Sequence, residues 1–340
     1  MPSDLTIAIS PYHLATREVP ALCSLLLADQ AVTLMPTPAS GSSTDDLDAA
    51  VKQSPRFLRF MERIRWSVPL WRAGILSGDY SSENIVDGLG AVYSRVMEGE
   101  DLGPLRRIFT GIASATEHEL LDKISGDLLK GGPDPAVNIP INACVDEFAS
   151  RHSILVARAA PTSLAQRAES YLYERRFAFA MPVLTQASGR RLLELRDHLR
   201  PTLATLRAAI LSAVADEAGV AVVTRAESNG RQERTAAAPS VTDAARRLSL
   251  DFESARGDLL SGDDDEGTRI MHAYASVTAV RVPSDAVLRS SLLALRSASL
   301  AKPIMAGASP KGSEIPDQDP ARAERVTVLV MKLMNMRPEN

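Results

Sequence analysis

The sequence predicts a mixed α and β fold, either α+β or α/β, with a helix-rich first half and several short strands of unknown topology. Residues 5–9 and 31–35 have the alternating or apolar pattern of strands, and an apolar helical segment lies between them. Amphipathic helices follow, with apolar residues spaced three and four positions apart. A composition of 45% hydrophobic and 24% charged residues is typical of a globular chain and excludes a disordered or fibrous one.

The first half of the chain begins with a strand, a helix at residues 19–28 and a second strand, an order compatible with a parallel pair. Turn-forming residues predict a loop at 37–46. Beyond this loop, the spacing of apolar residues and the helix start and stop signals predict three helices, at residues 54–64, 85–99 and 114–131.

In the second half of the chain, segments with the two-residue period of strands alternate with segments that have the 3.6-residue period of helices. Strand patterns occur at residues 153–158, 177–183, 220–224 and 270–282. Helical patterns occur at residues 141–148, 162–176, 192–210, 241–259 and 284–295. We expect the helix at 192–210 to be kinked or split at Pro201, because proline removes a helical hydrogen bond.

The length of 340 residues suggests two domains, or one large domain with insertions, at roughly 100–200 residues per domain. We divide the chain into residues 1–135, a β-α-β start with a helical block, and residues 136–300, a mixed region with an exposed loop at 226–240. Residues 301–323 contain four prolines and are expected to be mobile. Residues 324–340 are expected to hold a closing strand and a tail.

Bulk properties indicate a soluble cytoplasmic protein. The chain has two cysteines, Cys23 and Cys144, both in apolar segments where a buried structural thiol is expected. The first residues lack the basic and apolar regions of a signal peptide, and no run of about 18 apolar residues occurs. A net charge of −4 disfavours a strongly basic nucleic-acid binder.

Residues 54–76 combine arginines with aromatic residues. Five of the 15 aromatic residues of the chain fall between Phe57 and Tyr80, including both tryptophans. Such a helix is suited to an acidic protein partner or an anionic surface. The candidate partner-binding residues are Arg56, Arg59, Arg63, Arg65, Trp66, Trp71 and Arg72. The alternative is a helix packed by its aromatic residues with outward arginines, neutralised by the acidic residues at 79–101.

The sequence therefore predicts a cytoplasmic interaction or assembly protein with a protein partner, without an identifiable catalytic motif. It identifies no cofactor and leaves open whether the protein is an enzyme. One alternative is a metal-assisted hydrolase that uses His118, Glu119 and Asp122, since positions i and i+4 of a helix share a face. The opposing interpretation of these residues is a solvated helix start. A second alternative is a nucleic-acid-binding protein that uses the same arginines, because a local basic patch can suffice.

Overall fold

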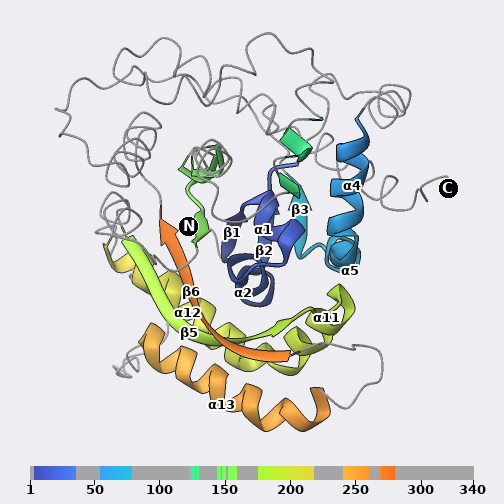
Figure 1. Cartoon of the computed structure of the whole chain (residues 1–340). Coiled ribbons are helices and arrows are strands. Elements are labelled where there is room, and N and C mark those ends of the chain that lie inside the picture. The colour runs from blue at the N-terminus through green and yellow to red at the C-terminus, as the bar shows by residue number, and fades with distance from the viewer. Residues whose placement is uncertain are drawn as a thin grey trace, which may run out of the picture.

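The predicted mixed α and β fold is confirmed: in the part of the chain that the structure describes, six strands form one sheet, and helices pack against it (Figure 1). The computed structural model describes residues 4–35, 54–78, 122, 124–126, 128–129, 144–146, 148–150, 152–158, 175–217, 240–259 and 269–279.

The sheet begins with the predicted strand–helix–strand unit. Strands β1 (Thr6–Ile9) and β2 (Gln30–Thr33) are parallel, and Ile9 lies opposite Thr33. Two helices connect them, α1 (Pro11–Thr16) and α2 (Val19–Leu27). The sequence pattern predicts only the second of these, because a helix of six residues is too short to show a periodicity.

The next connection, from β2 to β3, carries the arginine-rich helix. Helix α4 (Pro55–Ile64) continues through a 3₁₀ turn, η1 (Arg65–Ser67), into α5 (Val68–Arg72). Strand β3 (Leu76–Gly78) then pairs with β2 in parallel and forms one edge of the sheet.

Three strands from the second half join the same sheet, in the order β3-β2-β1-β4-β6-β5. Strand β4 (Leu155–Arg158) is parallel to β1, and β6 (Arg269–Ala279) is antiparallel to β4. Strand β5 (Arg175–Thr185) pairs antiparallel with β6 and forms the other edge. Strands from both halves of the chain thus share a sheet whose first four members are parallel.

The edge position of β5 explains how this strand accommodates a proline. Pro182 lies opposite His272 of β6 and has no amide hydrogen for a second neighbour. The strand also begins earlier than the sequence pattern predicts. Residues 175 and 176 belong to β5, whereas the apolar spacing extends a helix to about residue 176.

Two of the remaining helices confirm the expected break near Pro201. Helix α11 (Gly189–His198) ends before Leu199, and Pro201 is the second residue of α12 (Arg200–Glu217). A third helix, α13 (Val241–Leu259), packs against α12 and β5. Figure 1 shows α13 and α2 on opposite sides of β5, and both helices contact this strand.

Helix α2 lies at the centre of the core. All of its residues except Val19 are buried, and it contacts β1, β2, β4, β5 and β6. A helix that is apolar on every side has to be buried on every side. Leu22, Leu25 and Leu26 are almost fully buried, and each contributes about 1.5–3 kcal/mol by leaving water.

None of the helices in the described ranges is long and apolar enough to cross a membrane. Several predictions lie outside these ranges: the loop at 37–46, the helices at 85–99 and 284–295, the capping box at 114–117, the strand at 220–224, the loop at 226–240 apart from its last residue, and everything beyond residue 279. The helix predicted at 162–176 also lies outside them, apart from residues 175 and 176.

Candidate functional site

The N-terminus of helix α4 is capped by a residue that is distant in sequence. Pro55 occupies the first turn, where its missing amide hydrogen costs nothing, but Ser54 makes no side-chain cap. The amide of Arg56 instead donates to Asp122 Oδ1 at 3.0 Å, and the Arg56 guanidinium lies 3.3 Å from Asp122 Oδ2. The carboxylate of Asp122 therefore caps the positive end of the helix dipole.

The apolar side of α4 is fixed by burial. Phe57, Phe60 and Ile64 are fully buried, as their spacing along the helix predicts, and Met61 joins them. This face contributes to the main core, so the opposite face of the helix is exposed to solvent.

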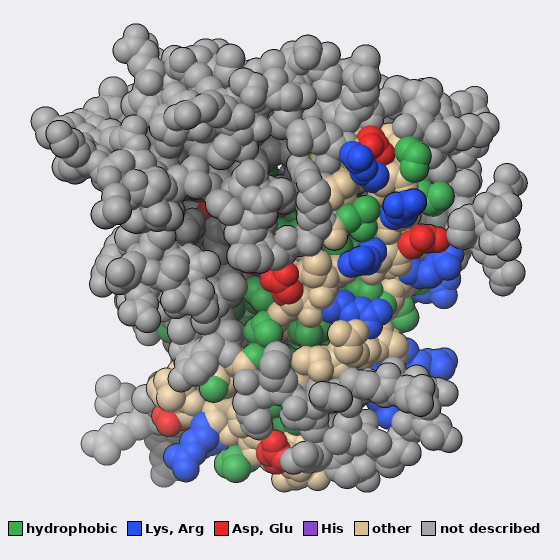
Figure 2. Space-filling model, viewed as in Figure 1, with side chains coloured by type: hydrophobic (Ala, Val, Ile, Leu, Met, Phe, Trp, Pro, Cys, Tyr) green, Lys and Arg blue, Asp and Glu red, His purple; other side chains and the backbone are tan. Residues whose placement is uncertain are grey.

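The arginine face of α4, defined here as Arg59, Glu62 and Arg63, is exposed. Arg59 and Arg63 are one helical turn apart, and among the described residues neither makes an ion pair. These three residues and Leu129 line an open hollow of about 490 Å³. In Figure 2 basic side chains gather over the region of α4, with acidic ones between them. Two unpaired cations one turn apart at a hollow suit an acidic side chain of a partner.

The other candidate arginines differ in their surroundings. Arg56 is held by Asp122, whereas Arg65 and Arg72 are exposed on η1 and α5, beyond the end of α4. Arg65 also interacts with other groups of the chain. Of the predicted arginines, Arg59 and Arg63 are therefore the pair that the fold brings together around one hollow.

The indole nitrogens of both candidate tryptophans make hydrogen bonds within the chain. Trp71 is 2% exposed, and its indole nitrogen donates to Ser67 Oγ at 3.1 Å. The Trp66 indole nitrogen donates to the carbonyl of Leu14 at 3.3 Å, and the guanidinium of Arg17 lies 5.0 Å from its ring centroid. The two side chains join α4 and α5 to the core, and the burial of Trp71 leaves it no surface for a partner.

The residues of the metal alternative are only partly described. His118 and Glu119 lie outside the described residues, whereas both carboxylate oxygens of Asp122 contact Arg56. Within the ranges that the structure describes, no three His, Cys, Asp or Glu side chains are grouped closely enough to hold a metal ion.

Both cysteines are buried, as their apolar neighbours in the sequence predict. Cys23 and Cys144 are free thiols. Burial raises the pKa of Cys23, so its thiol stays protonated and is a poor nucleophile.

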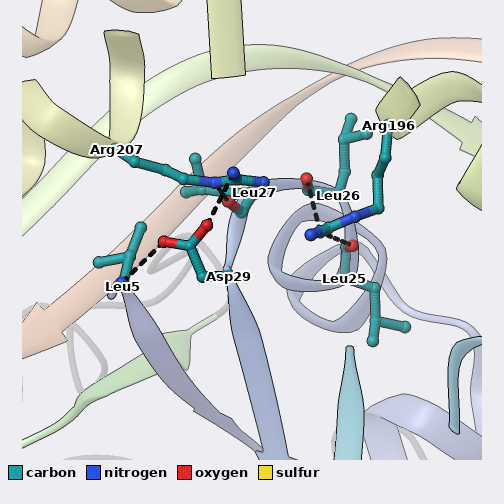
Figure 3. Close-up of polar contacts among 7 residues, drawn as sticks. All are labelled: Leu5, Leu25, Leu26, Leu27, Asp29, Arg196 and Arg207. Carbon is teal, nitrogen blue, oxygen red and sulfur yellow. Dashed lines mark hydrogen bonds and ion pairs between the residues drawn. The ribbon is translucent and has the colours of Figure 1, made fainter. Parts of the chain in front are cut away.

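A second cluster of arginines, which no local sequence pattern indicates, lies at the C-terminal end of α2 (Figure 3). Arg196 donates to the carbonyls of Leu25 and Leu26 at 2.6 and 3.0 Å. Arg207 donates to the carbonyl of Leu27 at 2.5 Å and lies 2.7 Å from Asp29 Oδ1. The negative end of the helix dipole favours such cations.

We interpret this cluster as structural, because both guanidinium groups are used in contacts within the protein: Arg196 with two carbonyls, and Arg207 with a carbonyl and Asp29. Burial, followed by repulsion from Arg207, lowers the pKa of Arg196 to about 10. Asp29 also accepts from the amide of Leu5 at 2.9 Å, which ties β1 to the end of α2.

Two buried hydroxyls beside the parallel strands are not indicated by any sequence pattern. Ser10 and Thr33 are 2% and 1% exposed, and among the described residues neither hydroxyl oxygen has a hydrogen-bond partner. Neither residue belongs to a motif, so the only signal in the sequence is a polar side chain at the end of an apolar strand.

Comparisons with protein-family models, with curated proteins and with solved structures find no match to this chain.

Proposed function

We propose that the chain is an interaction or assembly protein that binds an acidic protein surface through the arginine face of α4. The observation that carries the proposal is the exposed pair Arg59 and Arg63, which has no ion pair among the described residues and borders a hollow. A pair of exposed cations that the fold does not use for its own stability is available to a partner.

The fixed position of the pair supports this proposal. Phe57, Phe60 and Ile64 anchor the opposite face of α4, so the two guanidinium groups extend from a backbone that is held in place. Little backbone entropy is therefore lost on binding. An ion pair between these arginines and a partner's carboxylates should contribute more to the binding free energy than an ion pair between two mobile surface side chains.

A protein partner suits the composition of the face better than a phosphate backbone. Glu62 lies between the two arginines in the sequence and lines the same hollow together with the apolar side chain of Leu129. A carboxylate repels phosphates, whereas a protein surface of mixed charge can pair with Glu62 as well. The net charge of −4 also opposes general attraction to nucleic acid.

We keep the cytoplasm as the proposed location. Two free, buried cysteines in 340 residues match the usage of a reducing compartment.

The test is quantitative capture of proteins from a host extract on the immobilised full chain, with Arg59→Glu/Arg63→Glu as the variant. The matched control is Arg246→Glu/Arg247→Glu on α13, which makes the same change of charge at two exposed arginines. We expect an acidic protein to be captured by the wild type and by the control but lost from the α4 variant. Its retention should fall with added salt.

Equal capture by all three proteins would refute the proposal. A labelled DNA duplex and vesicles with anionic lipid are tested with the same variants. Binding of either probe that depends on Arg59 and Arg63, without such dependence for any protein, would replace the proposal with the corresponding alternative.

A further inference from the structure

The strand order defines a second place where a ligand is expected. From β1 the chain adds β2 and then β3 on one side, and it later returns to place β4 on the other side. The carboxyl ends of these four parallel strands lie at the same edge of the sheet. In open sheets of this kind, ligands bind outside the carboxyl ends, between the strands where the order reverses. Here that position is between β1 and β4.

The backbone register places two polar residues at the ends of these neighbouring strands. Ile7 lies opposite Leu155 and Ala8 opposite Val156. Continuing this register by two residues brings Ser10, directly after β1, level with Arg158, the last residue of β4. A hydroxyl residue and an arginine thus occupy adjacent strand ends.

The hydroxyl of Ser10 is buried. The residue is 2% exposed, and its Oγ atom makes no hydrogen bond within the ranges that the structure describes. Ser10 precedes α1 and its carbonyl accepts from the amide of Leu14 at 3.2 Å, yet its side chain does not cap the helix. Most buried hydroxyls are hydrogen-bonded, and one that is not calls for an explanation such as a ligand.

Thr33 offers an internal comparison. Its hydroxyl is also buried and has no hydrogen-bond partner in the described part of the chain. Thr33 lies opposite Ile9, the residue before Ser10, and Ser10 keeps an extended backbone. Because side chains alternate along a strand, Thr33 and Ser10 belong to opposite faces of the sheet.

We propose that the carboxyl edge between β1 and β4 binds the anionic group of a small molecule, a phosphate or a carboxylate. The Ser10 hydroxyl donates a hydrogen bond to this group, and Arg158 enters the proposal as a cationic residue placed by the register at the end of the neighbouring strand. The proposal is independent of the arginine face of α4, which lies in the β2–β3 connection.

The test measures binding of ATP and of citrate to the full chain by isothermal titration calorimetry at low salt. ATP offers phosphates and citrate offers carboxylates, so the two probes distinguish the sources of the anionic group. We expect at least one of them to bind the wild type. Ser10→Ala and Arg158→Gln should each weaken this binding about tenfold, the effect of one hydrogen bond to a charged group.

Two controls keep the result specific. Thr33→Val removes the other buried hydroxyl and should leave binding unchanged, and so should Arg59→Glu/Arg63→Glu, which removes the cations of α4. Thermal unfolding of each variant is measured in parallel. We expect the midpoint of Ser10→Ala to stay at the wild-type value, since the lost hydroxyl has no hydrogen-bond partner among the residues that the structure describes.

Three results would overturn the proposal: binding of neither probe at millimolar concentration, wild-type affinity in both Ser10→Ala and Arg158→Gln, or an equal loss in Thr33→Val. Loss of binding only in the α4 variant would move the anion site to α4 and would equally refute a site between β1 and β4.

Discussion

Replacing Arg196 with methionine should destabilise the fold by about 2 kcal/mol, because this side chain closes the end of α2 (Figure 3). Methionine keeps a similar length and volume but cannot donate to a carbonyl. The variant therefore leaves the last-turn carbonyls of Leu25 and Leu26 without the donor that they have in the wild type.

The magnitude follows from two opposing effects. Hydrogen bonds that involve a charged group contribute about 1.5–3 kcal/mol each, and Arg196 makes two of them, at 2.6 and 3.0 Å. Burying the guanidinium opposes this gain, and the lowering of the pKa of Arg196 to about 10 reflects that cost. Methionine avoids the cost of a buried charge, which reduces the net loss to about 2 kcal/mol.

Urea unfolding followed by far-UV circular dichroism measures this loss as a shift of the midpoint at constant slope. The control is Arg190→Met, because Arg190 is exposed on the same helix and makes no ion pair among the described residues. We expect the control to stay within about 0.5 kcal/mol of the wild type. An Arg196→Met variant within that same margin would refute the role assigned to the cluster.

Three further variants test other contacts, each by urea unfolding. Asp122→Ala should cost about 1 kcal/mol, because it removes the cap of α4 and a partly exposed ion pair; an unchanged midpoint would contradict this role. Gly189→Ala should cost about 1–3 kcal/mol, since its Cβ would lie 2.5 Å from the Trp66 carbonyl oxygen; Gly126→Ala, which meets only the side chain of Arg56, should be tolerated. Above pH 9.0, the ordinary pKa of the thiol, the unfolded chain releases the Cys23 proton while the folded chain retains it, so the thiol costs stability as pH rises. Between pH 9 and 10 the free energy of unfolding should therefore fall less in Cys23→Ala than in the wild type, by up to about 1.4 kcal/mol per pH unit. An equal fall in both proteins would contradict the raised pKa of Cys23.

The elements that the sequence predicts well are those with a clear period. The strands β1 and β2, the helix α2 between them and the amphipathic α4 all follow from the spacing of apolar residues. Helix α1 and strand β3 are missed because six and three residues are too few for a period to show. Their positions are set by neighbours, since β3 is fixed by pairing with β2.

The candidate site is predicted in part. The sequence predicts a stripe of arginines adjoining Phe57, Phe60 and Ile64. In the structure the three apolar residues are buried, while Arg59 and Arg63 are exposed. The grouping of Trp66 and Trp71 with the arginines stays a prediction, because an enrichment of aromatic residues in a short segment does not show whether an indole is covered. Trp71 is buried and donates to Ser67, a contact that depends on the turn between α4 and α5.

The edge between β1 and β4 is beyond prediction from the sequence for a different reason. Ser10 and Arg158 are separated by most of the first half of the chain, and only the strand order makes them neighbours. The same holds for Arg196, whose carbonyl partners in α2 are 171 and 170 residues away. A local pattern carries no information about such pairs.

The abundance of arginine in this chain is therefore a weak indication of function, and the partners of each arginine are a stronger one. Within the described residues, arginine repeatedly serves the fold through its planar group of donors. Guanidinium groups stack on an indole ring, close a helix end or pair with a neighbouring carboxylate; the residues that do so are Arg17, Arg56, Arg191, Arg196, Arg200 and Arg207. Arg59 and Arg63 lie on a helix anchored by its opposite face and have no ion pair among the described residues. If arginine content alone determined binding, reversing the charge of Arg246 and Arg247 on α13 would weaken partner capture as much as reversing that of Arg59 and Arg63. If a fixed and unpaired position determines it, only the α4 variant will lose the partner.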